Sequence, residues 1–121
     1  MKNDRIKIID YDPLGDSLFV RIPEGKYQSS VQLGDIILDL GKINGELAVV
    51  GFEMLDASKK FKISPYLLSR GIQQLHAEIR ITEKEIVISI FIQVLQRGKR
   101  REDSMKFLST NEGLPPLTAT I

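Results

Sequence analysis

Apolar and polar residues alternate along much of the chain, and this period of two is typical of β-strands with one buried face. The first alternating run covers residues 5–11, where Ile6, Ile8 and Tyr11 are expected to point inward. A polar lead-in, Met1 to Asp4, precedes this run and is expected to be frayed. Asp, Pro and Gly then supply turn residues before the alternation resumes, so the first unit is predicted to be a β-hairpin.

Further strands are predicted between residues 31 and 55. Residues 31–40 indicate two short strands separated by a bend. Asn44-Gly45 is a strong hairpin signal, because a type I′ turn needs positive φ at both of its central positions. The run Leu47 to Leu55 carries apolar residues on both faces, which predicts a central strand. Gly51 inside it predicts a bulge or a close backbone contact.

One or two short helices are predicted after this strand. Asp56 or Ser58 is suited to begin a first helical turn. Ser64-Pro65 predicts a second helix, with Ser as the N-cap and Pro at the first helical position. Gly71 is expected to end it.

The second half of the chain returns to strands. Residues 75–82 alternate strictly, residues 86–95 form the most apolar run, and residues 105–108 suggest a third strand. Gly and Pro residues at 113, 115 and 116 predict an extended tail over residues 109–121.

These patterns predict a single domain over residues 1–121 of the α+β class, mostly β. An antiparallel meander of four or five strands over residues 5–62 leads into a short helix at 63–73. A three-stranded antiparallel meander follows at 74–108, and then the tail. The two meanders are expected to pack face to face or to share one sheet.

The run from Ile86 to Leu95 has two apolar faces, one of them formed by Val87, Phe91 and Leu95. In a small antiparallel protein one sheet face normally meets water. The second face is therefore expected to meet the first β layer, the short helix or another protomer. Phe91 and Leu95 are predicted interaction residues on this basis, and a homo-oligomer is one expected outcome.

Composition narrows the classes of function. The 121 residues include 17 basic and 16 acidic side chains, so the net charge of +1 creates no general field for nucleic acid or an anionic membrane. The absence of cysteine excludes disulfides, thiolate metal sites and cysteine nucleophiles. It suits a reducing cytoplasm, where we expect the protein to reside. The most apolar run is far shorter than the roughly 20 residues of a membrane-spanning helix.

Candidate reactive groups are few, and no catalytic, cofactor or metal site is predicted from them. Asp10, Asp12 and Asp16 gather around the first turn, but a calcium loop starting at Asp10 would place Leu14 and Arg21 where ligands belong. Capping of the turn is the simpler role for these carboxylates.

His76 is the single histidine, and its alternation places it on a solvated sheet face. Ser89 and Glu78 are the nearest candidates for a nucleophile and an orienting acid, but nothing in the sequence brings them together with His76. No glycine-rich phosphate loop is present.

The turn residues Lys99, Arg100 and Arg101 form the main basic cluster, and a weaker one lies at residues 59–62. Such a cluster can bind nucleic acid. Here Glu102 and Asp103 follow at once, so keeping an apolar strand soluble is the simpler role.

The first half of the chain resembles a prokaryotic family catalogued as domain of unknown function 2283. The matching residues are Tyr11-Asp12, Asp16, Leu18-Phe19-Val20, Leu38-Asp39 and the run from Gly51 to Ser58. Phe19 stands where Tyr is common in the family, and typical members are shorter than this chain. The resemblance implies a small β-meander that closes on a short helix. It implies no established activity, although some members look like the antitoxin partner of a small toxin.

Three functions remain open from the sequence. The first is a non-catalytic protein-binding or assembly module that uses a sheet edge or the tail, with a homo-oligomer or a small protein as partner. The second is a nucleic-acid or small-molecule binder that acts through the basic turn. The third is a hydrolase-like enzyme that uses the Asp cluster or His76.

Overall fold

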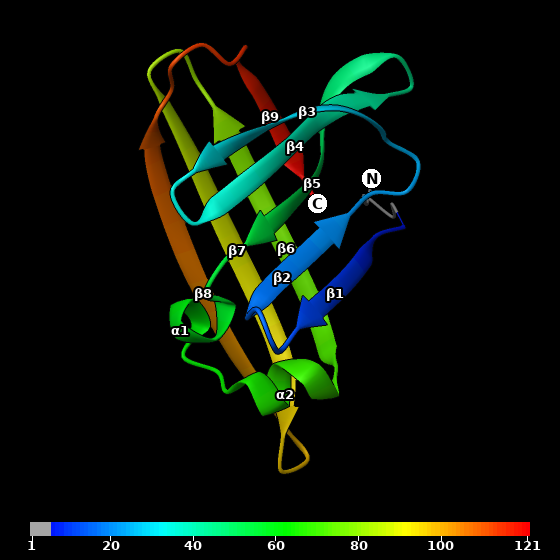
Figure 1. Ribbon diagram of the computed structural model, residues 1–121, viewed down its shortest axis with the longest axis vertical. Coiled ribbons are helices and arrows are strands. Elements are labelled where there is room, and N and C mark those ends of the chain that lie inside the picture. Colours follow the sequence, from blue (N-terminus) through cyan, green and yellow to red (C-terminus); the bar gives the residue numbers. More distant parts are fainter. Residues whose placement is uncertain (1–5) are drawn as a thin grey trace.

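The computed structural model describes residues 6–121. The predicted lead-in at residues 1–4, and Arg5 at the start of the first predicted strand, lie outside this range. Within it the protein is mostly β, with two antiparallel sheets packed face to face and two short helices (Figure 1). The predicted fold class is confirmed.

Sheet A has the strand order β1-β2-β5-β4-β3. Its strands are β1 (Ile8–Asp12), β2 (Ser17–Arg21), β3 (Lys26–Leu33), β4 (Ile36–Ile43) and β5 (Glu46–Met54). The central position of β5 agrees with its two apolar faces. The order departs from a simple meander at one place, because β2 pairs with β5 and the chain crosses to the far edge to begin β3.

Sheet B has the order β8-β7-β6-β9. It consists of β6 (Ile72–Ile81), β7 (Glu85–Gln96), β8 (Lys99–Thr110) and β9 (Leu117–Thr120). The last strand belongs to the C-terminal tail and pairs with β6. Its neighbour Ile121 exchanges backbone hydrogen bonds with Ala77 and is 6% exposed, so the tail is part of the core.

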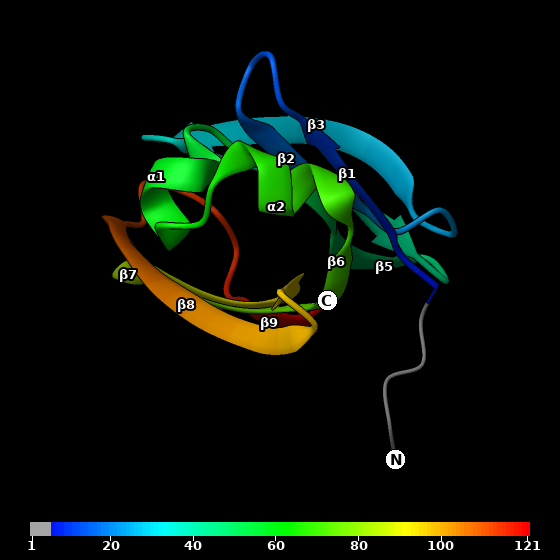
Figure 2. The same ribbon diagram turned by 90° about the horizontal axis from the view of Figure 1, so that it is seen from below.

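The helices α1 (Ala57–Phe61) and α2 (Pro65–Arg70) lie at one end of the sandwich (Figure 2). Ser64 caps α2 by accepting the N–H of Leu67, and Gly71 ends the helix, as the sequence predicts. Asp56 occupies the N-cap position of α1 without a capping hydrogen bond from its side chain. Phe61 and Leu68 are buried, so both helices are held by their docking to the sheets.

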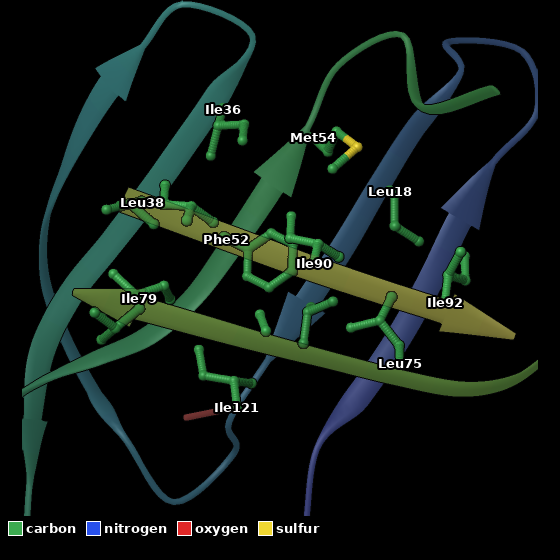
Figure 3. Packing of buried hydrophobic residues seen from close by; sticks show 14 of the residues in the cluster. Leu18, Ile36, Leu38, Phe52, Met54, Leu75, Ile79, Ile90, Ile92 and Ile121 are labelled. Carbon is green, nitrogen blue, oxygen red and sulfur yellow. The ribbon is translucent and has the colours of Figure 1, made fainter. Parts of the chain in front are cut away.

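The core fills the space between the sheets, whose strands cross rather than run side by side (Figure 3). Sheet A contributes Leu18, Ile36, Leu38, Phe52 and Met54, and sheet B contributes Leu75, Ile79, Ile90 and Ile92. All of these side chains are at most 1% exposed. The alternation in residues 75–81 and 86–94 therefore predicts the inner face of sheet B correctly.

In the first predicted strand, residues 5–11, the inward face is wrong for two residues, of which Ile6 lies before β1 and Ile8 begins it. Ile6 and Ile8 are 76% and 42% exposed, whereas Ile9 and Tyr11 are partly buried against the core. The Lys7 ammonium donates to the carbonyl of Leu75 and so links this segment to β6. Ile6 with Ile8, and Ile9 with Tyr11, each fit the period of two of a strand. A shift of the strand by one position exchanges its buried and exposed faces.

Gly51 is required where three strands meet. The pairing of β4 with β5 shifts between Asp39 and Leu40, so Val50 is an extra residue on β5 and forms a bulge beside Gly51. A Cβ at Gly51 would lie 2.6 Å from the carbonyl oxygen of Val20 on β2. Both predicted roles of this glycine, bulge and close contact, are present.

Replacing Gly51 by Ala is expected to lower the free energy of unfolding by about 1 to 3 kcal/mol, because backbone of β2 must move to admit the methyl group. Urea unfolding followed by circular dichroism measures this. Gly15→Ala is the control, since its Cβ would approach only side-chain atoms of Asp12 and Ser17 in an exposed turn. Equal stability of the Gly51→Ala variant and the wild type would contradict the steric role.

Candidate functional site

A polar cluster joins the β1–β2 turn to the start of α1. Asp16 sits in this turn with φ of 53°, a left-handed conformation that Asp tolerates better than most residues. The Tyr11 hydroxyl donates to Asp16 Oδ1 at 2.7 Å. The Ser58 N–H donates to Oδ1 at 2.9 Å and its hydroxyl to Oδ2 at 2.7 Å. One carboxylate thereby holds a strand, a turn and a helix together.

The electrostatics of this cluster favour an ionised Asp16 and a neutral Tyr11. Burial acts to raise the pKa of Asp16, but the hydrogen bonds from Tyr11 and Ser58 and the charge of Lys59 outweigh it, so the pKa lies below its ordinary value. Burial raises the pKa of Tyr11, and the hydrogen bond to Asp16 raises it further. Asp16 therefore acts as a hydrogen-bond acceptor at neutral pH. The contacts give the cluster a structural role.

The three candidate acids do not converge. Asp16 points to Tyr11 and Ser58, while Asp12 Oδ1 accepts the N–H of Leu14 inside the turn. Asp10 is exposed on β1. Among residues 6–121 no group of three or more His, Asp or Glu side chains is arranged to hold a metal ion.

The outer face of sheet B carries an open groove of about 670 Å³. His76 on β6 stacks on Phe91 of β7, with ring centroids 6.0 Å apart and 18° between the ring planes. Glu78 and Ser89 are register partners beside this pair, and Lys106 lies opposite Ser89 on β8. The groove therefore has an aromatic pair in one row of the sheet and, in the next row, Ser89 between an acidic and a basic side chain.

The structure brings His76, Glu78 and Ser89 to one face, which the sequence alone did not indicate. No hydrogen bond joins these three side chains, and His76 is instead oriented by its stacking on Phe91. The Asp cluster lies on sheet A and His76 on the outer face of sheet B, so the two alternatives of the hydrolase hypothesis concern separate places on the molecule.

The second apolar face of β7 is this same outer face. The first β layer packs on the opposite face of sheet B (Figure 2), so coverage by that layer is wrong, whereas Leu95 at the end of β7 shares a surface hollow with Tyr66 and Leu67 of α2. Phe91 is half-buried, Leu95 is 43% exposed and Leu108 on the neighbouring strand is 63% exposed.

The basic turn lies at the tip of the β7–β8 hairpin. Lys99 and Arg100 are exposed there, and Arg100 is opposite Leu95 on the outer face. Arg101 points to the other side, where its guanidinium donates to the carbonyl oxygen of Lys62 and to Gln96 Oε1. The three cations therefore do not form one surface.

The β8 strand is the feature that sequence reasoning underestimated, because it extends well beyond the predicted 105–108. It pairs with β7 over twelve residues without a register shift, and it forms one edge of sheet B. In the sequence an apolar residue appears at every second position only at Met105 and Phe107, so the half of the strand before Met105 carries no pattern of hydrophobicity. The charged residues at positions 99–103 argue against a strand in the sequence, since such residues are uncommon in strands.

Asp16→Asn is expected to lower stability at pH 7 by about 1 to 3 kcal/mol, because the partly buried donors of Tyr11 and Ser58 lose a charged acceptor. The folded-state pKa of Asp16 is lowered, so its contribution is present above the ordinary value of 3.8 and is lost as pH falls through the folded value. The stability of the wild type should therefore fall below about pH 4 as Asp16 becomes protonated. The stability of the Asp16→Asn variant should fall less over the same range.

Chemical unfolding at pH 7 and at pH 3 measures both effects. Asp10→Asn is the matched control, because Asp10 is exposed on the same hairpin. Tyr11→Phe tests the hydroxyl contact separately and should cost about 1 kcal/mol. If Asp16→Asn and Asp10→Asn behave alike at both pH values, the cluster does not hold the turn to the helix.

Membrane insertion has no support from the helices, since neither of the two in residues 6–121 is long and apolar enough to cross a bilayer.

Two curated relatives match over most of their length. An uncharacterized protein of Methanocaldococcus jannaschii is 36% identical over 104 residues, covering 84% of this chain and 87% of the relative. A protein of Methanosarcina mazei described as a putative hypoxanthine phosphoribosyltransferase is 34% identical over 102 residues, covering 84% of this chain and 80% of the relative. No solved structure matches the chain.

A family described as protein of unknown function (DUF2283) matches residues 8–58. This range begins with β1 and ends at Ser58, so it contains all of sheet A and the Tyr11–Asp16–Ser58 cluster. Tyr11 lies near the start of the match and Ser58 at its end, and hydrogen bonds join both of them to Asp16. The chain belongs to the DUF2283 family.

Proposed function

We propose that the protein is a non-catalytic module that binds a protein partner by strand addition at the β8 edge of sheet B. The observation that carries the proposal is the edge itself, which is twelve residues long and in unbroken register with β7. In strand addition the main chain supplies the affinity, so the mode needs no reactive side chain.

The other sheet edges are less suited to this mode. The β1 edge has five residues, and at the far side of sheet B the four residues of β9 cover only the second half of β6 and leave residues 72–76 as another short edge. The β3 edge is longer, but its register with β4 shifts between Tyr27 and Ser29, and such bulges interrupt edge pairing. The tail is already paired with β6, so it is not free to act as the added strand.

Two kinds of partner fit an open edge. One is a second copy of the chain, and the other is a small protein such as the toxin that the family resemblance suggests. The lack of cysteine agrees with a reducing cytoplasm as the place of action.

Amide hydrogen exchange of the purified full-length chain, free and bound to a partner captured from the native host, tests the mode. Exchange should slow within Lys99–Thr110 on binding and stay unchanged in β1 and β3, because added backbone hydrogen bonds protect only the edge that receives them. A bound partner that protects other strands, or recovery of the chain alone and monomeric, would contradict strand addition at β8.

A small-molecule binder is the second candidate, favoured by the groove over His76 and Phe91. Its volume of about 670 Å³ is within the range of ligand sites, and its floor suits a planar ring. The description of the M. mazei relative suggests a purine base as the first probe.

Titration with hypoxanthine, followed by NMR, tests this candidate. Binding in the groove should shift the ring resonances of His76 and Phe91, and Phe91→Ala should abolish the shift, with Phe19→Ala on sheet A as the control. Phe19 is 39% exposed and lies outside the groove. Unchanged spectra at millimolar hypoxanthine would contradict purine binding here.

A further inference from the structure

The outward-facing residues of β8 form a row that is complementary to itself. This row reads Arg100, Glu102, Ser104, Lys106 and Leu108. Glu102 and Lys106 lie two positions on either side of Ser104. An antiparallel copy of the same strand would therefore meet opposite charges if it were centred on this serine.

Symmetry limits the registers that two β8 edges can adopt. A twofold axis perpendicular to the sheet keeps the outer faces together, so outward residues oppose outward residues. Each register is then defined by the one residue that faces its own copy.

We propose that the partner at the β8 edge is a second copy of this chain, paired antiparallel with Ser104 opposite Ser104. This deepens the function proposed above and rests on it. Glu102 of each chain then faces Lys106 of the other, so this contact occurs twice by symmetry. Opposite charges directly across an antiparallel pair stabilise it.

The neighbouring registers are worse. In a register centred on Asp103, this carboxylate faces Asp103 of the other chain, and Arg100 of each chain faces Lys106 of the other. Centres at Glu102 or Lys106 likewise oppose identical charges. A centre at Met105 brings no opposite charges together, so Ser104 gives the best register of the five.

Contacts within the chain leave Glu102 and Lys106 available for the pairing, whereas the Ser104 N–H, which donates to Asp103 Oδ1 at 2.8 Å, would exchange this bond for one to the partner. Gln93 donates to Glu102 Oε2 at 2.8 Å, which holds this carboxylate on the outer face. Lys106 is exposed, and no hydrogen bond or ion pair engages it among the described residues. On the inner side, Arg101 would face Phe107 and Asp103 would face Met105, so no like charges meet there.

Paired in this way, the two copies form one continuous sheet with β8 strands at its centre. The free edges are then the four-residue β9 strands and residues 72–76 of β6, which β9 does not cover. Pairing of this kind removes the long edge that would otherwise invite aggregation. Charged residues on edges often prevent pairing, but here their order favours one register over its neighbours.

Sedimentation velocity over a concentration series tests the inference. Glu102→Lys and Lys106→Glu should each weaken dimerisation by about tenfold or more, because attraction becomes repulsion at two symmetric contacts. The double variant Glu102→Lys/Lys106→Glu should restore it. Its composition and net charge equal those of the wild type, so restoration assigns the loss in the single variants to the pairing of charges.

A thiol test reports the register. The chain has no cysteine, so Ser104→Cys introduces a unique thiol that should cross-link to its copy with a short bifunctional reagent. Thr118→Cys, exposed on β9 at the opposite edge, should not.

Three results would overturn the inference. They are a monomer at all concentrations, a dimer indifferent to both charge reversals, and a dimer in which the Thr118→Cys variant cross-links but the Ser104→Cys variant does not. A monomeric chain whose β8 amides are protected by a different protein would overturn the self-pairing alone and leave strand addition standing.

Discussion

Burial of apolar side chains between the two sheets is the interaction on which the rest of the structure depends. Phe52 and Met54 of sheet A and Ile79 and Ile90 of sheet B belong to one buried cluster between the sheets. Neither sheet can therefore keep its inner face from water without the other. The family match ends at Ser58, yet the core that sheet A needs is completed by strands beyond it.

The Asp16 cluster controls how the chain passes from one layer to the next. Hydrogen bonds from Tyr11 and Ser58 converge on one carboxylate, and the Ala57 N–H donates to the Asp16 carbonyl at 3.0 Å. They fix the direction in which α1 leaves β5, and hence the placement of Phe61 in the core. This accounts for a sequence signature rich in polar groups without assigning it to catalysis.

Much of the fold could be predicted from local pattern. The Asn44-Gly45 turn, the Ser64 cap and the inner face of residues 75–81 each follow from chemistry within a few residues. The strand phase at Ile6 and Ile8 could not be decided, because apolar residues occupy both faces and only contact with the other sheet selects one.

The candidate sites depended more on tertiary structure. In the Tyr11–Asp16–Ser58 cluster, Asp16 and Ser58 are 42 positions apart in the sequence. Their hydrogen bonds form only when the fold brings the turn and the helix together. The groove over Phe91 likewise needs the registers of three strands. The length of β8 could not be predicted, because residues 99–104 are all charged or polar and their strand conformation comes from pairing with β7.

The proposed function depends on a backbone edge and its pattern of charge. Isotope-filtered NMR on a mixture of labelled and unlabelled chains measures contacts between chains directly. Self-pairing predicts intermolecular backbone contacts along β8, centred on Ser104 and including the pair of Glu102 with Lys106. Intermolecular contacts centred on another segment, or their absence at millimolar concentration, would contradict it.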